Sequence, residues 1–330
     1  MTAIDYNYYG SSDDEHAKVA FFMMLFNQYR TRRVNFESNW EENAALAAPD
    51  YMGSFTYGRD RAPGAKHAQY QLDSSAQIYS FRFASIVDWL VTPQNMMWSR
   101  VGFDNKELMK ERTVMEYCRD ISEVLWRERY EAKANFVSQN AQNMQGLGLF
   151  GNMGMFIDEI DNYLDPDESG LRYLATPVGE IYIMCDHQKR VVGFIRHFRL
   201  TAQQAKNKFK NKIIPQIEAA LAIGSQTLFD FLHFVRPRTD YNPFEFLTNK
   251  FFKYESTYIS VQGFCILEEK GYRTLPLAYG RYMQFPDEDY GRGPTDMARP
   301  NLKTNNSAMR TFLKQAHRAG DPTCWSMIPD

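Results

Sequence analysis

Apolar residues near the start of the chain recur at the spacing of a helix. The first of them stand at relative positions i, i+3, i+4 and i+7, and they are Val19, Phe22, Met23 and Phe26. Residues at these spacings share one face of a helix. The face continues through Trp40, so we predict one long helix from His16 to Ala47 that ends before Pro49.

Two more helical patterns follow. One begins at Asp73 or Ser74, either of which can cap it, and stops before Pro93. The other runs from about Asn105 to Asn140 and carries charged residues on its opposite face. Residues 50–70 combine glycine and proline with polar residues, which predicts an exposed loop.

From Gly148 onward the pattern changes to alternating or continuous apolar runs bounded by turn residues, which is typical of strands. With one short run earlier in the chain, the predicted strands are Met96 to Val101, Leu149 to Glu159, Arg172 to Ala175, Ile181 to Cys185, Val191 to Leu200, Leu228 to Val235, Tyr254 to Glu268 and Leu277 to Met283. Thr201 is placed to cap a helix from Ala202 to Phe209, a second short helix runs from Ile213 to Ala222, and a last helix from about Asn301 to Arg318. This order, without βαβ alternation, predicts an α+β fold.

Charge and composition narrow the function. Lys and Arg number 38 and Asp and Glu 40, a net charge of −2, so the chain is no globally basic nucleic-acid binder and any DNA contact must be local. Aromatic residues make up 15% of the chain, which favours broad subunit interfaces. The four cysteines are far apart and form no CxxC pair, so we expect reduced, buried thiols: Cys118, Cys185, Cys265 and Cys324.

No apolar stretch approaches the roughly 20 residues of a membrane span. The most apolar short run, Val19 to Phe26, is closed off by Arg30, Arg32 and Arg33. The N-terminus is acidic and rich in tyrosine, unlike the basic start of a signal peptide. We therefore expect a soluble intracellular product without a membrane partner.

Residues Gly146 to Gly151 match the GxGxxG dinucleotide fingerprint letter for letter. A dinucleotide site needs these glycines after a strand and at the opening of a helix, where N–H groups meet the pyrophosphate. In this chain they follow a helix and lead into a strand, the reverse order. We therefore predict a helix-to-strand turn and keep a nucleotide-binding enzyme only as an alternative.

The remaining templates for catalysis and metal binding are not matched. Six acidic residues cluster without the glycine and distal glutamate of a calcium loop, which predicts a solvated loop: Asp158, Glu159, Asp161, Asp165, Asp167 and Glu168. The six histidines show no close pairing, and neither GxSxG nor GxxxxGK[ST] occurs. We therefore expect a structural protein, not an enzyme, with no catalytic, metal-binding or cofactor-binding residues.

Two basic runs are left. The first is Lys206, Lys208, Lys210 and Lys212, which we interpret as a solvated face, with a contact to nucleic acid as the alternative. The second is Lys303, Arg310, Lys314 and Arg318 on the last helix. Three of these recur at seven and four residues, on one side of the helix, where they can meet either a phosphate backbone or acidic residues of a neighbouring subunit.

One segment of the sequence resembles a known family. It is Tyr290-Gly291-Arg292-Gly293-Pro294, and it is followed by Leu302-Lys303-Thr304 and a helix. This segment resembles the YGRSP signature that portal (head-to-tail connecting) proteins of short-tailed bacteriophages carry ahead of a long helix. Gly293 replaces the usual serine, and Asn305-Asn306 stands where leucine-asparagine is commoner. Other segments resemble the family in the same order: Asn35 to Ala47, Asp73 to Ser75, Leu90 to Trp98, Gly148 to Gly151, Arg196 to Ala205 and Phe234 to Arg238.

The resemblance implies a layout and a role. Residues 1–294 would be the wing, 295–320 the first stem helix and 321–330 the approach to the clip, with the second stem helix, tunnel loop and crown expected to be missing from this chain. Family members form a ring, usually of twelve, at a capsid vertex of the virion, and double-stranded viral DNA is packaged and ejected through it.

The partners implied are a terminase motor, the major capsid or scaffolding protein and a tail adaptor, with assembly in the host cytoplasm. Closed rings need heterologous interfaces, which suits broad aromatic surface. Another virion protein, such as a tail adaptor with a wing-like domain, is the alternative reading.

Overall fold

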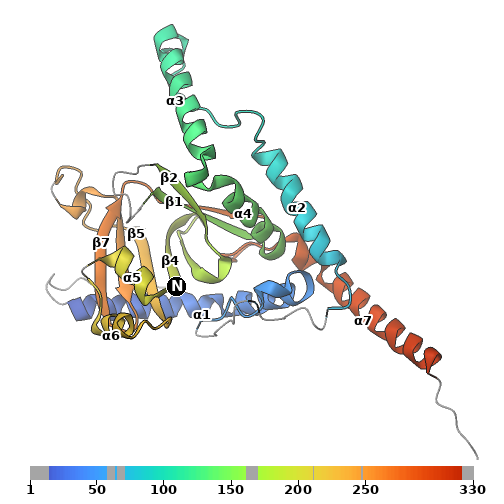
Figure 1. Ribbon diagram of the computed structural model, residues 1–330. Helices are drawn as coiled ribbons and strands as arrows, with labels where there is room; N and C mark the ends of the chain where they lie inside the picture. The colour runs from blue at the N-terminus through green and yellow to red at the C-terminus, as the bar shows by residue number, and fades with distance from the viewer. Residues whose placement is uncertain are drawn as a thin grey trace, which may run out of the picture.

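The computed structural model describes residues 15–57, 64, 71–160, 170–210, 212–246 and 248–321, and its fold is α+β (Figure 1). The helices are α1 (Glu15–Ala47), α2 (Ser75–Val91), α3 (Arg112–Tyr130), α4 (Phe136–Phe150), α5 (Ala202–Phe209), α6 (Pro215–Ile223) and α7 (Pro294–Gly320). The strands are β1 (Asn152–Glu159), β2 (Leu171–Ala175), β3 (Ile181–Cys185), β4 (Val191–Thr201), β5 (Leu228–Pro237), β6 (Tyr254–Ser260), β7 (Cys265–Tyr272) and β8 (Leu277–Arg281). Short 3-10 turns lie at Pro49–Tyr51, Leu108–Lys110, Ala132–Ala134, Val178–Glu180 and Asn249–Phe251.

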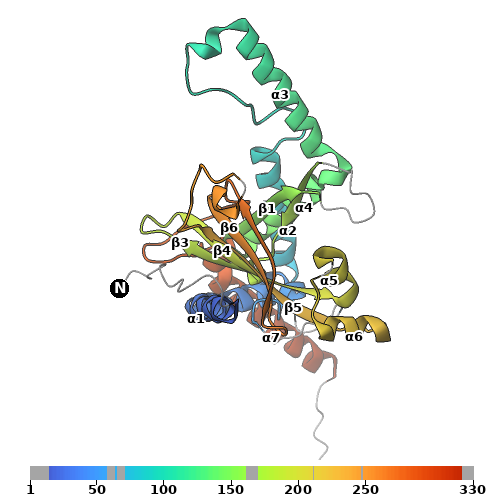
Figure 2. The ribbon, with the colours of Figure 1, turned by 90° about the vertical axis from the view of Figure 1, so that its left-hand side faces the viewer.

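A five-stranded antiparallel sheet, in the order β3-β4-β5-β6-β7, forms the larger half of the body. Because side chains alternate across a strand, one face of the sheet receives α1 and the other receives α5 and α6. Figure 2 shows α1 nearly end-on against the sheet, with α5 and α6 together on another side. The α1 side of the core is built from Val19, Phe22, Leu25, Phe26, Tyr29, Tyr182, Met184, Ile195, Leu232, Phe234 and Ile259.

Arg33 is a buried charge that joins α1 to this sheet. Its guanidinium donates to the carbonyl oxygens of Ile181 (2.7 Å) and Gly179 (2.9 Å) and to the carboxylate of Glu37 (2.8 Å). Longer bonds of 3.2 Å reach the carbonyls of Val178 and Phe55. The group also lies 3.5 Å from the centroid of the Tyr182 ring. The planar fork of arginine thus satisfies several carbonyls that would otherwise be buried without donors.

The smaller sheet, in the order β2-β1-β8, packs against α4 and the second half of α1. α4 runs directly into β1, and α2 lies antiparallel beside α4. Ala84 of α2 contacts Met144 and Leu147 of α4 in a small apolar cluster. Asn140 donates to Asp88 and Thr92 at the far end of α2, so this helix pair is held by both apolar and polar contacts.

Most elements lie where the sequence predicts them. Thr201 caps α5 with a reciprocal capping box, in which its hydroxyl accepts from the Gln204 N–H and the Gln204 side chain accepts from the Thr201 N–H. Asp73 accepts from the Ser75 N–H (3.0 Å) at the start of α2. Cys118 is a buried free thiol, but Cys185 and Cys265 are free thiols only partly buried. Cys324 and most of the loop predicted over residues 50–70 lie outside the described residues.

The single helix predicted from Asn105 to Asn140 is wrong. Asn135 adopts φ +55° and separates α3 from α4, which continues to Phe150. The break turns the chain so that the rings of Tyr130 and Phe136 pack edge to face, 5.5 Å apart. Tertiary packing of aromatic rings therefore overrides a continuous helical pattern.

Three more predictions need correction. Met96 to Val101 pairs with none of the described strands: it runs along α3, where the Val101 N–H donates to the Ser122 hydroxyl (2.9 Å). Tyr254 to Glu268 forms two strands, β6 and β7, joined by a tight turn. The last helix begins at Pro294 rather than Asn301, because proline suits the first helical position and Pro300 is accommodated inside the helix.

Candidate functional site at the base of the C-terminal helix

The signature segment, residues 290–294, lies where α1, β3 and the end of α4 meet. Tyr290 is buried, and its ring packs against Phe36 and Trp40 of α1 with centroid distances of 5.1 and 5.3 Å. Its hydroxyl accepts a hydrogen bond from the Ile183 N–H of β3 (3.2 Å). Burial raises the pKa of the Tyr290 hydroxyl above its usual range, so the ring stays neutral.

Glycines allow two stretches of backbone to touch here. Gly151 ends α4 with φ +71°, and a Cβ atom at this position would lie 2.2 Å from the Arg292 carbonyl carbon and 2.4 Å from the Gly293 nitrogen. A Cβ at Gly293 would lie 2.8 Å from the Gly151 nitrogen, and one at Gly291 would lie 2.5 Å from the Gly151 oxygen. We call this contact between Gly151 and residues 291–293 the glycine crossing.

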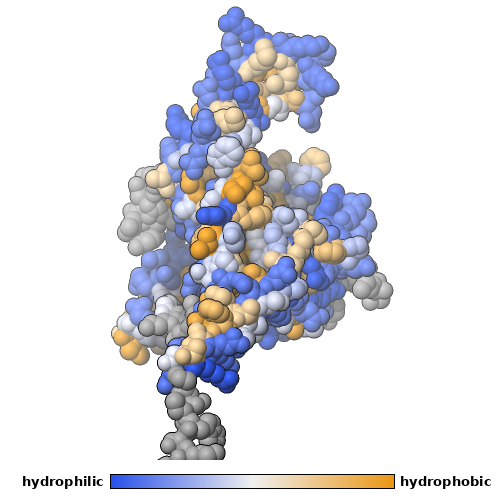
Figure 3. Space-filling model, turned by 90° about the vertical axis from the view of Figure 1, so that its right-hand side faces the viewer, coloured by the Kyte–Doolittle hydropathy of each residue, from blue (hydrophilic) through white to orange (hydrophobic). Residues whose placement is uncertain are grey.

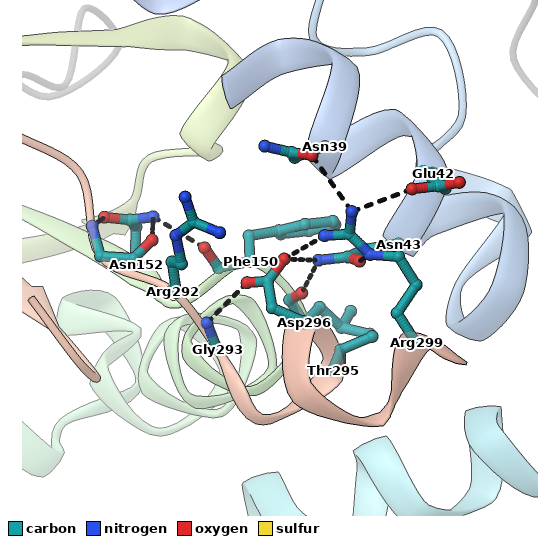
Figure 4. Close-up of polar contacts among 12 residues, drawn as sticks. Asn39, Glu42, Asn43, Phe150, Asn152, Arg292, Gly293, Thr295, Asp296 and Arg299 are labelled. Carbon is teal, nitrogen blue, oxygen red and sulfur yellow. Dashed lines mark hydrogen bonds and ion pairs between the residues drawn. The ribbon is translucent and has the colours of Figure 1, made fainter. Parts of the chain in front are cut away.

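Asn152, the first residue of β1, holds the glycine crossing together. Its side-chain oxygen accepts from the Gly291 N–H (2.7 Å), and its side-chain nitrogen donates to the Gly291 carbonyl (2.9 Å). The same nitrogen donates to the Phe150 carbonyl (2.7 Å), and the Tyr279 hydroxyl donates to the oxygen (3.0 Å). A fully buried amide therefore satisfies backbone groups on both sides of the crossing (Figure 4).

A polar network fixes the first turns of α7. Asp296 accepts from the Gly293 N–H (2.8 Å), which caps the helix, and from the Asn43 side chain (3.0 Å). Arg299 binds Asp296 and also donates to the oxygens of Asn43 (3.0 Å), Asn39 (3.1 Å) and Glu42 (2.9 Å). Asn39, Glu42 and Asn43 all lie on α1, so α1 sets the direction in which α7 leaves the body (Figure 4).

The end of α4 supplies the third support. The Thr295 hydroxyl donates to the Gly148 carbonyl (2.9 Å), and the Asn43 side chain donates to the Leu149 carbonyl (3.1 Å). Carbonyls in the last turn of a helix lack partners within the helix. The start of α7 and the C-terminal end of α1 therefore satisfy groups that α4 leaves unpaired.

Lys303 also belongs to this base. It forms an ion pair with Glu42 of α1. The hydrogen bond from Lys303, together with the charges of Lys303 and Arg299, holds the pKa of the Glu42 carboxyl below its usual value. Of the four basic residues predicted along the last helix, this one is paired within the described chain.

Beyond its base, α7 projects from the body (Figure 1). Asn305 binds Asp73, and Asn306 accepts from the Leu72 N–H (3.3 Å). Every residue from 307 to 321 is exposed. At 1.5 Å per residue, the free part of the helix is about 20 Å long.

The free part of α7 has two unlike sides. Met309, Phe312 and Leu313 form one, which we call the α7 stripe; Phe312 is 64% exposed. Leu302 lies on the same side of α7, nearer its base, where it packs against the core formed by α1, α4 and the sheets. The basic side consists of Lys303, Arg310, Lys314 and Arg318, which fall within about 80° of one another at 3.6 residues per turn and point roughly away from the stripe.

The structure brings together the signature residues predicted from the sequence, Tyr290, Gly291, Arg292 and Pro294. Arg292 binds Glu288 through its guanidinium (Nε to Oε2, 2.9 Å), and Pro294 is the first residue of α7. Sequence reasoning missed the residues that hold them, which are Asn39, Asn43, Asn152, Asp296 and Arg299. The only signal in the sequence that could have indicated these residues is that polar side chains occupy positions where the helix or strand pattern expects apolar ones.

The GxGxxG match is explained by packing. Gly146 and Gly148 lie inside α4, where a Cβ at Gly148 would lie 2.6 Å from the Phe83 ring, and Gly151 is the helix C-cap. The run forms the end of α4 and leads into β1, so the predicted change from helix to strand lies at Gly151, and Leu149 and Phe150 belong to the helix rather than to the predicted strand. Its glycines contact α2 and the glycine crossing. No helix N-terminus opens at this run to receive a phosphate.

The first basic run and the acidic cluster predicted from the sequence do not form a site among the described residues. Lys208 lies over the rings of Phe198 and Tyr258 at 5.1 and 4.6 Å, so part of the first basic run packs on aromatic rings. Asp158 and Glu159 lie on β1, and the rest of the acidic cluster falls outside the described residues. Across the described chain, no three His, Cys, Asp or Glu side chains gather as metal ligands. Among its helices, none combines the length and apolar character needed to cross a bilayer.

Comparisons with known proteins identify the family of this chain. A family model described as "Bacteriophage head to tail connecting protein" matches residues 21–326. A curated relative, the "Probable portal protein" of Bordetella phage BPP-1, is 22% identical over 285 residues, which cover 85% of this chain and 49% of the relative. The chain thus spans about half the length of this relative.

Proposed function

The chain belongs to the family of bacteriophage head to tail connecting proteins, and we propose that it is a portal subunit whose copies form a closed ring at a capsid vertex. About twelve copies would surround an axial channel, through which double-stranded viral DNA is packaged and ejected. The ring would assemble in the host cytoplasm and remain in the virion. The family membership supports a structural, non-enzymatic role.

The observation that carries this proposal is the projecting half of α7. A helix with 14 exposed residues at its end (307–320) and an apolar side buries little within its own chain. Such a helix gains stability by packing against others, as in a bundle or ring. In a ring, the α7 stripe would face a neighbouring α7 and the basic side would face the channel or an acidic neighbour.

The basic side is sparse, which suits a conduit. Lys303 is already paired with Glu42, so Arg310, Lys314 and Arg318 are the cations of this side left without an ion pair within the described residues. Each phosphate that a protein neutralises strengthens binding and its salt dependence. A few cations per copy attract DNA without holding it against translocation.

The three segments of the chain would then take different positions in the ring. We assign residues 1–294 to the wing, 295–320 to the first stem helix and 321–330 to the approach to the clip. The rigid base of α7 supports this division, because α1, α4 and the signature segment fix the angle between helix and body. The terminase motor, the capsid or scaffolding protein and the tail adaptor would bind the assembled ring.

Electron microscopy and light scattering of the purified chain test the proposal. We expect ring-shaped particles with an axial hole and a mass of many copies. A strictly monomeric protein at micromolar concentration would contradict it. Particles of another form, such as a thin collar, would favour the tail-adaptor alternative, and saturable nucleotide binding by calorimetry would revive the enzyme alternative.

Neutralising the free end of the basic side should affect DNA rather than folding. For Arg310→Gln with Lys314→Gln, we expect weaker binding of duplex DNA by the assembled protein. The slope of log affinity against log salt should shrink by roughly one to two units, about one for each lost phosphate contact. Fluorescence anisotropy at several salt concentrations measures this slope.

Lys303→Gln is the matched control, because Lys303 is paired with Glu42. It should lower thermal stability slightly and leave the salt slope unchanged. If the double variant dissociates the ring while DNA affinity stays the same, these cations belong to a subunit contact.

A further inference from the structure

α2 presents an apolar face to the outside of the body. Five of its apolar side chains are each between 51% and 68% exposed: Ile78, Tyr79, Ile86, Trp89 and Leu90. At 3.6 residues per turn they fall within about 120° of one another, on the side of α2 away from Ala76, Ser80 and Ala84, which are buried. We call these five residues the α2 patch.

The patch has the size and composition of an interface core. Five large side chains, each more than half exposed, present on the order of 500 Å² of apolar surface, as much as the largest patch on an ordinary monomer. Arg82 is the one charged residue within it, and it forms no ion pair with the described chain. Trp, Tyr and Arg are the residues that contribute most at protein interfaces.

Within the part of the chain that the structure describes, α2 is held by its other side and by its two ends. The opposite side of α2 is packed against α4 through Ala84, and Phe83 lies against Gly148. Asp88 and Thr92 bind Asn140 at the C-terminal end, and Asp73 binds Asn305 at the other. These contacts fix α2 with its apolar face outward.

The segment that begins α2 is bonded to α7. Leu72 and Asp73, which precede α2, bind Asn306 and Asn305 of α7. Figure 3 shows apolar side chains gathered over the middle of the side on which α2 lies, and again lower down over α7. Added together, the α2 patch and the α7 stripe offer on the order of 800 Å² of apolar surface, which is what one partner buries at a standard protein interface.

We propose that the α2 patch is one half of the contact between neighbouring copies of this chain, covered by a different surface of the next copy. The inference rests on the proposed ring and names the surface that builds it. Pairing of the patch with itself about a two-fold axis would bring two Arg82 side chains together. A head-to-tail contact avoids this, and head-to-tail contacts are those that close into rings. A single cation among five apolar residues does not suit DNA, whose phosphates require several cations.

Trp89→Glu tests the proposal. Because Trp89 is exposed in the single chain, the monomer should keep its thermal unfolding temperature, whereas the concentration at which rings form should rise at least tenfold. Ile223→Glu is the matched control: Ile223 is 83% exposed at the end of α6, away from the patch, and its replacement should leave assembly unchanged. Sedimentation velocity over a concentration series measures both.

A photo-crosslinking residue in place of Tyr79 gives a second test of the proposed contact between copies, and this test does not require that the contact be broken. Mixed light and isotope-labelled copies should yield crosslinks between copies, located by mass spectrometry. Suppose that the wild-type protein forms rings. If Trp89→Glu then assembles as well as the wild type, or if crosslinks form only inside one copy, the inference is overturned and the portal proposal stands. A monomeric wild-type protein overturns both.

Discussion

Gly151→Ala is expected to destabilise the folded chain by about 2–5 kcal/mol, the sum of two costs. The left-handed backbone at φ +71° costs a residue with a Cβ about 1–2 kcal/mol. The Cβ would also lie 2.2 Å from the Arg292 carbonyl carbon, so the end of α4 and the signature segment must move apart, and such overpacking costs about 1–3 kcal/mol. Chemical denaturation followed by circular dichroism measures the loss.

Gly224→Ala separates the two costs. Gly224 ends α6 with φ +68°, but no atom lies within 4 Å of the position of its Cβ. It should lose only the backbone cost of about 1–2 kcal/mol. If the two variants lose the same free energy of unfolding, the close contact at the glycine crossing has no energetic weight and this reading of the site is wrong.

The consequence for function lies in α7. Separation of residues 291–293 from Gly151 removes the fit of Asn152 to Gly291 and shifts Thr295 from the Gly148 carbonyl. The base of α7 then loses its support from α4 and β1. Limited proteolysis should cut Gly151→Ala within residues 294–320 faster than it cuts Gly224→Ala, and rings should form less readily even at temperatures where both variants stay folded.

Two sequence motifs that look unrelated meet in this contact. The GxGxxG match ends at Gly151, and the portal-like signature begins at Tyr290, but each supplies one side of the glycine crossing. The order of helix and strand was sufficient to predict a helix-to-strand turn at the first motif. Sequence alone did not show why the glycines are needed, because the backbone that they contact lies about 140 residues further along the chain.

Local patterns predicted the elements well where local chemistry decides them. Thr201 and Gln204 form their capping box within four residues, and Ile181 to Cys185 is a strand between turns. Predictions were wrong where distant contacts decide. Directly after the break at Asn135, the Phe136 ring packs against Tyr173 of β2, and the turns of α7 before Pro300 are held by α1.

Buried polar residues were the hardest to predict. Arg33 stands beside Arg30 and Arg32, and the three together read as the polar end of an apolar run. Yet Arg33 lies seven residues after Phe26 and seven before Trp40, on the buried side of α1. That spacing was a usable signal. Glu37 lies one helical turn away, but the other partners were not predictable, since three of them are backbone carbonyls about 145 residues away.

Arg33→Met is expected to cost about 3–5 kcal/mol of the free energy of unfolding, as removal of one member of a buried ion pair does. Methionine keeps the apolar length of the side chain but leaves the Glu37 carboxylate and the carbonyls of Gly179 and Ile181 buried without their donor. Arg33→Lys should lose somewhat less, because an ammonium keeps the charge but cannot reproduce the fork. Urea unfolding followed by tryptophan fluorescence measures both.

Arg32→Met is the matched control, because Arg32 is exposed one residue away, and it should change stability by less than about 0.5 kcal/mol. The larger loss at Arg33 should also reach α7: α1 is held to β3 by Arg33 and carries Asn39, Glu42 and Asn43, which bind Arg299. Arg33→Met should therefore speed proteolysis within residues 294–320 under conditions where the rest of the chain stays folded. Equal stability of the Arg33 and Arg32 variants would contradict the role of Arg33 in joining α1 to the sheet, and global unfolding without earlier cleavage in α7 would contradict the coupling of α1 to the projecting helix.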